Sequence, residues 1–246
     1  MPRAKKKRER DPKRSHRPYN PSPQLRPTSR RTGLPNAATS GAGWVCGRCE
    51  QEHIDKFLKL EKDIPSSGRG WLPHSGYFDQ GNDKPMLQFH IDDKKRFREQ
   101  WLPLVQEQLA ALKLQCPCCQ KALQSHAVVA IDLNRIEPGA ALWPHTDFQL
   151  GIGVNPVTVI TLLQPAQQGG LFSVAKEATV AWTKSAVHGS ARLARSGRDM
   201  LLVDMFECGD VCVLNGARYA HCVSRVTSGL GSVARKSLSV TVRCLP

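Results

Sequence analysis

From residue 127 onward, hydrophobic and polar residues follow the pattern of short β-strands. Apolar residues alternate with polar ones or form short runs, and Gly, Pro and Asn separate most of the segments. Because no helical period lies between the strands, the pattern favours a sandwich, barrel or jelly roll over a βαβ fold. The predicted strands are Ala127–Leu133, Val157–Leu163, Leu171–Val174, Ala178–Trp182, Met200–Phe206, Asp210–Leu214, Cys222–Val226 and Ser237–Arg243.

The preceding region, residues 41–125, is predicted to be largely helical. A short helix is expected at Gln51–Glu61, and apolar residues at helical spacing predict a second helix from Lys94 to about Gln115. Pro103 is expected to kink this second helix or to mark a restart. Residues 64–86 are rich in Gly, Pro and Ser, which predicts a long loop between the helices.

Residues 1–40 form a basic tail. They contain 12 Lys/Arg and 2 Asp/Glu, against 23 and 19 in the rest of the chain, so most of the net charge of +14 lies here. With almost no apolar residues, the tail cannot bury enough surface to offset chain entropy, and we expect it to be disordered. Lys5–Arg8 and Lys13–Arg14 resemble a nuclear localisation signal and are equally suited to non-specific binding of nucleic-acid phosphates. A nuclear location is therefore favoured over a cytoplasmic one.

The same composition predicts neither a secretory signal peptide nor a membrane-spanning segment. The tail has no apolar core of a signal peptide, and no stretch approaches the roughly 18 consecutive apolar residues of a membrane span. The predicted organisation is an α+β chain with a disordered tail (1–40), a helical, cysteine-bracketed region (41–125) and a jelly-roll domain (126–246). The small, basic segment 183–199 is expected to be a loop inserted in that domain.

His145 and Asp147 form a candidate metal-binding pair. In an extended segment, residues i and i+2 point to the same face, so this imidazole and carboxylate can bind one ion from one side. His221, 74 residues after Asp147, would complete a set of two histidines and one carboxylate that leaves positions open on iron(II). His188 is a rival third ligand, but no strand with a nearby Arg-x-Ser follows it.

The last predicted strand, from Arg235 to Arg243, alternates strictly. Three aliphatic residues beginning at Leu238 face one side, and the polar residues face the other. The polar face is either an ordinary solvated surface or an anion-binding site. In the second case the Arg235 guanidinium binds a carboxylate with help from the Ser237 hydroxyl, and Arg243 is the alternative arginine.

The order of these features resembles that of the iron(II)/2-oxoglutarate-dependent dioxygenases, and of their prolyl-4-hydroxylase-like branch in particular. His145-x-Asp147 is followed by the distal His221, and Arg235-x-Ser237 begins fourteen residues after that histidine. Three further segments look like the branch's strand with a Pro-Gly turn, its core strand with a Gly-Gly turn and the strand before the distal histidine: residues 132–147, 157–172 and 209–216. The resemblance covers about residues 127–245.

This resemblance implies a double-stranded β-helix, a relative of the jelly roll. It also implies iron(II) and the co-substrate 2-oxoglutarate, with ascorbate as a further cofactor. The family converts 2-oxoglutarate to succinate and CO2 while it hydroxylates or oxidatively demethylates a substrate. The implied iron ligands are His145, Asp147 and His221, and the implied residues for 2-oxoglutarate are Arg235 and Ser237.

Cysteines suggest a second metal site. Cys46 and Cys49 form one Cys-x-x-Cys pair and Cys116 and Cys119 another, and four such thiolates suit a structural zinc ion. The alternative is free thiols, and Cys118 competes with its neighbours for the same role. The other four cysteines are expected in the β-core: Cys208, Cys212, Cys222 and Cys244.

Three functional hypotheses follow. The first is a dioxygenase acting on a protein or nucleic acid, with a basic tail that contacts nucleic acid or an import receptor. The second is a catalytically inactive, zinc-containing jelly roll that binds nucleic acid or a nucleic-acid-associated partner. The third is a metal-binding cupin of different chemistry, which needs no anion-binding arginine.

Overall fold

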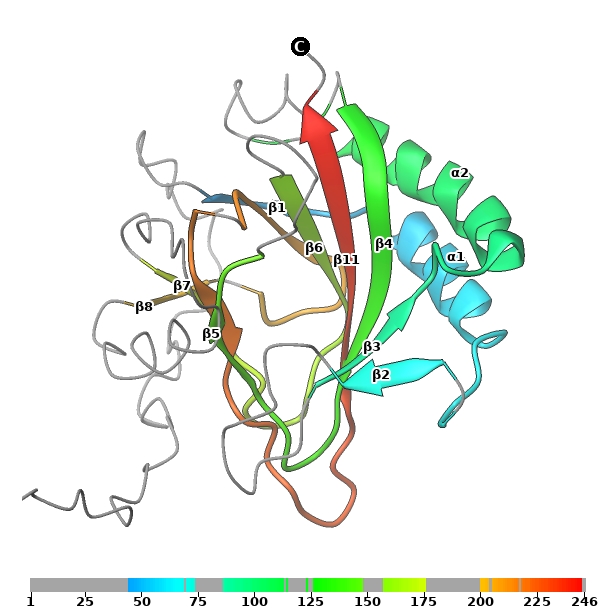
Figure 1. Ribbon diagram of the computed structural model, residues 1–246. Helices are drawn as coiled ribbons and strands as arrows, with labels where there is room; N and C mark the ends of the chain where they lie inside the picture. The colour runs from blue at the N-terminus through cyan, green and yellow to red at the C-terminus, as the bar shows by residue number, and fades with distance from the viewer. Residues whose placement is uncertain are drawn as a thin grey trace, which may run out of the picture.

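Figure 1 shows the computed structural model of the chain. It describes residues 44–68, 70–73, 86–112, 114, 123, 126–147, 157–175, 200–203, 205–216 and 218–244. Several predicted features lie outside these residues, among them the basic tail, the strand Ala178–Trp182, the inserted loop 183–199 and the rival ligand His188. No helix in the described part of the chain is both long and apolar enough to cross a membrane.

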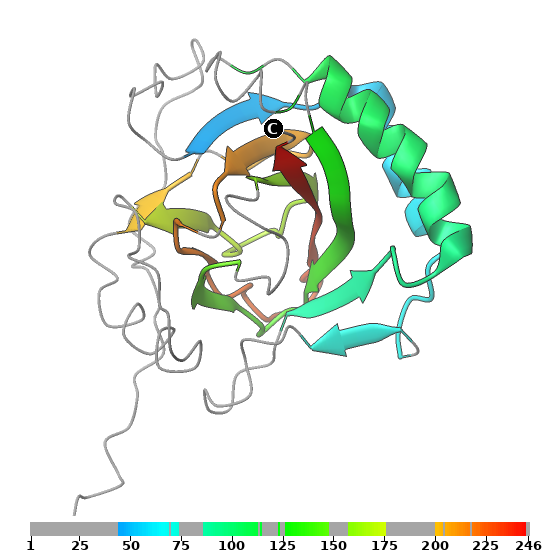
Figure 2. The same ribbon diagram turned by 45° about the horizontal axis from the view of Figure 1, so that its top comes forward.

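Two antiparallel sheets form the body of the protein (Figures 1 and 2). The larger has the order β1-β9-β6-β11-β4-β3-β2, and the smaller has the order β5-β10-β7-β8. The strands are β1 (Trp44–Arg48), β2 (Trp71–Pro73), β3 (Leu87–His90), β4 (His126–Ile136), β5 (Leu142–His145), β6 (Val157–Gln164), β7 (Phe172–Ala175), β8 (Met200–Leu202), β9 (Asp210–Leu214), β10 (His221–Val223) and β11 (Arg235–Cys244).

The inner faces of the two sheets share one apolar cluster, which we call the interior cluster. It contains Ile160 and Leu162 from β6 of the larger sheet together with Phe172 and Val174 from β7 of the smaller one. Side chains from both sheets can pack in one cluster only if the sheets face each other. The two sheets therefore form a jelly-roll-like sandwich, as the strand pattern predicts.

Two helices, α1 (Gln51–Glu61) and α2 (Lys95–Ala111), cover the outer face of the larger sheet (Figure 2). Phe57 of α1 stacks on Trp101 of α2 with ring centroids 5.7 Å apart, and both side chains are fully buried. They share a second cluster, the helix-side cluster, with Leu238 and Val240 of β11. Each such side chain contributes about 1.5–3 kcal/mol on burial, so the aliphatic face of β11 holds the helices to the sheet.

The helix predictions are largely confirmed. α1 has the predicted bounds, and α2 ends at Ala111 instead of near Gln115. Of the two outcomes expected at Pro103, a kink or a restart, the restart does not occur, because α2 continues through this residue. Pro103 lies on the exposed side of the helix, where water can hydrogen-bond the carbonyl group that proline leaves without a backbone partner.

The structure differs in one respect from the prediction of a separate helical region at residues 41–125. β1, β2 and β3 come from residues 41–125 and pair within the same sheet as the strands that follow residue 126. β2 also lies within the segment expected to be a loop, residues 64–86. These strands have only three to five residues, too few to show an alternating pattern. β1 pairs with β9 and β3 with β4, far along the chain, whereas β2 pairs with the closer β3.

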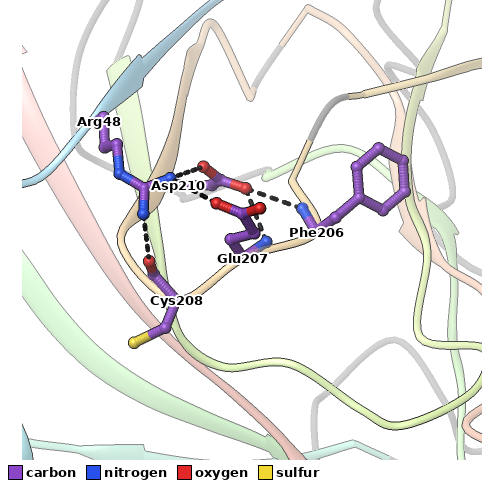
Figure 3. A network of polar contacts seen from close by, with 5 residues as sticks. All are labelled: Arg48, Phe206, Glu207, Cys208 and Asp210. Carbon is purple, nitrogen blue, oxygen red and sulfur yellow. Dashed lines mark hydrogen bonds and ion pairs between the residues drawn. The ribbon is translucent and has the colours of Figure 1, made fainter. Parts of the chain in front are cut away.

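A buried carboxylate fixes the turn that leads into β9 (Figure 3). Asp210 Oδ2 accepts hydrogen bonds from the backbone N–H groups of Phe206 (2.8 Å) and Glu207 (2.7 Å). Its Oδ1 accepts a bond of 3.1 Å from Arg48 at the end of β1. Arg48 also contacts the Glu207 carboxylate and the Cys208 carbonyl. This network ties the β8–β9 connection to the edge strand β1, and it explains why β8 ends well before the predicted Phe206.

Candidate metal centre

The smaller sheet brings the two candidate histidines together. His145 ends β5, His221 begins β10, and the two residues are paired across these antiparallel strands. Their ring centroids lie 4.3 Å apart. The pairing of β5 with β10 thus brings together two histidines that lie 76 positions apart in the sequence. It places both imidazoles on the inner side of the sandwich.

Asp147 completes the group. Its Oδ1 lies 3.5 Å from His145 Nε2 and 3.4 Å from His221 Nε2. One ligand atom from each of the three side chains lies within 4.8 Å of the others, and no other such group occurs among the described residues. The side chains of His145, Asp147 and His221 are 12%, 19% and 4% exposed. The three residues predicted as iron ligands therefore converge on one partly open point.

Asp147 is held on the side away from the histidines. Thr158 of β6 donates a hydrogen bond of 2.8 Å from Oγ1 to Asp147 Oδ2, and the Asp147 N–H donates to the Gly216 carbonyl at 2.8 Å. A Cβ on Gly216 would lie 2.1 Å from Asp147 Oδ2 and 2.7 Å from the Thr158 hydroxyl. A side chain at 216 would therefore displace the Asp147 carboxylate, which with glycine there directs Oδ1 at the two imidazoles.

The side chains of this centre shift the pKa of Asp147 and of His221. Burial alone would raise the pKa of Asp147, but His221 and His145 together hold it well below the usual range of a carboxyl group. For His221, burial acts to lower the pKa, and the Asp147 charge overcomes this and raises it. The Tyr219 carbonyl lies 3.2 Å from His221 Nδ1. If it accepts the Nδ1 proton, Nε2 is left free as a metal ligand.

Arg235 lies at the start of β11 and is 2% exposed. Its Nη1 donates a hydrogen bond of 3.2 Å to Ser237 Oγ, whereas Nε and Nη2 have no hydrogen-bond partner among the described residues. Burial lowers the pKa of Arg235 to about 10. An unpaired buried guanidinium is costly, and the pair of free donors matches the bidentate geometry of a carboxylate. Arg235 and Ser237 therefore fit an anionic co-substrate.

Comparison with solved structures identifies the fold. The chain matches the enzyme HygX from Streptomyces hygroscopicus, solved with nickel and 2-oxoglutarate bound (TM-score 0.55, 15% identity, 82% of this chain and 83% of that one). It matches SnoN, a non-heme α-ketoglutarate-dependent epimerase of nogalamycin biosynthesis (0.58, 11%, 83% and 80%). It also matches a prolyl-4-hydroxylase from Pseudomonas putida (0.50, 14%, 84% and 95%).

The chain has the fold of the 2-oxoglutarate-dependent oxygenases. The fold resemblance deduced from the sequence is thereby confirmed, at a distance of 11–15% identity. No protein-family model matches the sequence, and no functionally curated protein matches it either.

Within this oxygenase fold, the polar face of β11 points inward and is not a solvated surface. Ser237 and Thr241 are buried, and Ser239 between them is partly buried. Asp132 of β4 pairs with Ser239 and forms a contact of 2.6 Å with His90 of β3. Burial raises the pKa of Asp132, and the His90 contact opposes that effect. A polar row thus crosses the sheet beside Ser237.

Arg243, the alternative arginine, has a different environment. It is exposed near the far end of β11, eight residues from Arg235 and therefore on the order of 26 Å away along the strand. Of the two arginines, Arg235 alone is buried beside a hydroxyl on the inner face.

Sequence reasoning missed Thr158 and Gly216. Thr158 is the one polar residue near the start of the apolar run of β6. This break in the apolar pattern was the only feature of the sequence that pointed to a role for Thr158. Gly216 follows Asn215, and an Asn-Gly pair predicts a turn, which explains the glycine without any contact to a distant carboxylate.

The predicted zinc cysteines are only partly described. Cys46 packs against the interior cluster and Cys49 belongs to the helix-side cluster, so the two thiols contact opposite faces of the sheet. Burial raises the pKa of Cys49 to about 12, opposed by a hydrogen bond with Gln108. Cys116 and Cys119 lie outside the described residues, and the four-cysteine zinc site stays a prediction. Cys212 and Cys222 are buried, as expected.

Proposed function

We propose that this protein is an iron(II)- and 2-oxoglutarate-dependent dioxygenase that hydroxylates or oxidatively demethylates a macromolecular substrate, with succinate and CO2 as co-products. The environment of Arg235 is the observation that carries the proposal. A buried guanidinium with two free donors, inside a fold of 2-oxoglutarate-dependent enzymes, is explained by a dicarboxylic co-substrate. The group of two histidines and one carboxylate supplies the expected metal ligands.

Each residue has a defined role in this proposal. His145, Asp147 and His221 would bind iron(II) from one side and leave the remaining coordination positions open. Arg235 and Ser237 would hold the distal carboxylate of 2-oxoglutarate. Thr158 would keep the second oxygen of Asp147 away from the ion. When bound, the iron supplies activation of oxygen for the coupled oxidation of 2-oxoglutarate and substrate.

Anaerobic titration tests the proposal before any substrate is known. Iron(II) and 2-oxoglutarate are added to the wild-type protein and the visible metal-to-ligand absorption band is recorded. We expect a band in the wild type, none in His145→Ala and none in Arg235→Ala at the same ligand concentration. Arg243→Ala is the matched control, because this arginine is exposed on the same strand, and its band should equal that of the wild type.

If the wild-type protein bound iron(II) without a band or 2-oxoglutarate affinity, the dioxygenase proposal would fail and a cupin of different chemistry would be favoured. If the band formed but no substrate ever gave succinate, the inactive binding module would be favoured. The intact set of three ligands speaks against inactivity, because nothing in a pure binding module requires it.

The chemistry of the product is open to a second candidate. Among the solved structures with this fold are an epimerase and a carbocyclase, both α-ketoglutarate-dependent. The same site could therefore abstract hydrogen without returning a hydroxyl group. Mass spectrometry of the product distinguishes the two candidates, since hydroxylation adds one oxygen atom, epimerisation leaves the mass unchanged and ring closure removes two hydrogens.

The macromolecular substrate and nuclear location rest on the basic tail. Its charge of 12 Lys/Arg against 2 Asp/Glu suits binding to nucleic acid or to an import receptor. We expect deletion of residues 1–40 to weaken nucleic-acid binding and to shift the protein toward the cytoplasm, while the iron and 2-oxoglutarate band is retained. Unchanged location and nucleic-acid binding in this variant would refute this part of the proposal. Added ascorbate is expected to prolong turnover, as the sequence resemblance implies.

A further inference from the structure

Two cysteines face each other across the edge of the larger sheet. Cys46 of β1 and Cys212 of β9 are directly paired residues of antiparallel strands. Cys212 is fully buried, Cys46 is partly buried, and both thiols contact the interior cluster. The Cys46 thiol also adds to the rise that burial causes in the pKa of Cys212. Cys46 therefore has another thiol as its neighbour, on the face of the sheet opposite to Cys49.

We propose that Cys46 and Cys212 form an oxidisable dithiol site that closes to a disulfide between β1 and β9. Directly opposed residues of an antiparallel pair have Cα atoms about 4.5 or 5.5 Å apart. Both values lie inside the range of roughly 4.4–6.8 Å found for disulfides. The register thus places the two residues at a Cα separation that a disulfide can span.

The oxidant is a peroxide, and the reaction proceeds in two balanced steps. The partly exposed Cys46 sulfur attacks hydrogen peroxide, which gives a sulfenic acid and one water molecule. The Cys212 sulfur then attacks the Cys46 sulfur, the S–O bond breaks, and a second water molecule leaves with the Cys212 proton. In total, two thiols lose two electrons and two protons to one peroxide. Burial raises the pKa of Cys212, so we expect the second step to be slow.

The disulfide would reinforce a support of the metal centre. Among the described strands, β1 pairs with β9 alone. β9 leads within two residues to Gly216, whose carbonyl accepts the Asp147 N–H. A bond between residues 46 and 212 closes a very long loop, which restricts the unfolded chain strongly. It should therefore raise the thermal stability of the whole sandwich.

This site and the predicted zinc site compete for Cys46. A zinc ion would need the Cys46 and Cys49 sulfurs to point to one centre, whereas these two side chains contact different clusters. Cys212 is absent from the predicted zinc set. Replacing Cys49 therefore separates the two ideas, because it removes a zinc ligand and leaves the dithiol intact.

Peptide mapping of the full-length protein tests the proposal. The reduced protein is treated with hydrogen peroxide, remaining thiols are alkylated, and peptides are analysed without reduction. We expect a cross-linked pair of peptides containing Cys46 and Cys212, two hydrogen masses below the sum, that a thiol reductant separates. The melting temperature should rise by roughly 5–10 °C on oxidation. Cys46→Ser should remove this rise, and the control Cys49→Ser should retain it.

Two results would overturn the proposal. One is the absence of the linked peptides when peroxide has oxidised other thiols of the same sample. The other is one equivalent of zinc that is lost in Cys46→Ser and Cys49→Ser but kept in Cys212→Ser. The mapping on wild-type protein decides the question even if a serine variant fails to fold.

Discussion

Replacing Arg235 by methionine is expected to stabilise the ligand-free protein while it abolishes binding of 2-oxoglutarate. The lowering of the Arg235 pKa to about 10 by burial corresponds to a cost of about 3 kcal/mol for the charged side chain. Methionine removes this charge and the two unpaired donors, and it loses one hydrogen bond to Ser237, worth about 1 kcal/mol. The expected net gain in the free energy of unfolding is about 1–3 kcal/mol.

The pH dependence of this gain follows from the sign of the shift. A cation with a lowered pKa binds its proton less well in the folded protein than in the unfolded chain. The cost is thus complete below the folded pKa and fades only as the pH rises above about 10. The difference between Arg235→Met and wild type should therefore be constant from about pH 6 to pH 9.

Denaturant unfolding with and without ligand is the assay. With manganese(II) in place of iron(II), wild type should gain about 2.7 kcal/mol at a 2-oxoglutarate concentration of 100 times Kd, and Arg235→Met should gain nothing from 2-oxoglutarate. Arg243→Met is the control, with a change within about 0.5 kcal/mol expected at this exposed position. If Arg235→Met destabilised the ligand-free protein, or if 2-oxoglutarate still stabilised it, the guanidinium would have a structural partner and the argument would be refuted.

Three further substitutions test the supports of the site and the fold. Thr158→Val removes the hydrogen bond to Asp147 Oδ2 and should weaken manganese(II) affinity about tenfold or more, measured by calorimetry; an unchanged affinity would contradict the positioning role. Gly216→Ala would place a methyl group 2.1 Å from the same carboxylate oxygen, so we expect metal binding to be lost while circular dichroism shows retained strands. Asp210→Asn replaces the carboxylate that binds two backbone N–H groups and Arg48, and it should lower the unfolding free energy by about 2–3 kcal/mol in denaturant; a loss below about 0.5 kcal/mol would show that the turn holds without this charge.

The order of the site residues could be predicted from the sequence because each lies in a segment with a clear local pattern. His145 and Asp147 lie two residues apart in an extended segment, and the strict alternation of β11 separates Arg235 from its aliphatic neighbours. The alternation did not decide whether the polar face of β11 is exposed to solvent. The structure answers this through the smaller sheet, which covers that face, and no local pattern describes such a covering layer.

Other parts of the fold were beyond local patterns. β1 is only five residues long, and its place at the edge of the sheet depends on β9, more than 160 positions away. Thr158 acquires its role only when the chain brings Asp147 beside β6. In both cases the role of a residue depends on a partner far away in the chain. A single sequence contains no pattern that links the two partners.

The division of the larger sheet between distant parts of the chain has a consequence for protein preparation. A fragment that starts at residue 126 would retain every proposed ligand of iron and 2-oxoglutarate. It would, however, leave two strands with bare hydrogen-bonding edges, β9 without β1 and β4 without β3. It would also uncover the aliphatic face of β11 that α1 and α2 now bury. Exposed edges and an apolar face promote aggregation, so such a fragment should precipitate although the proposed site residues are all present.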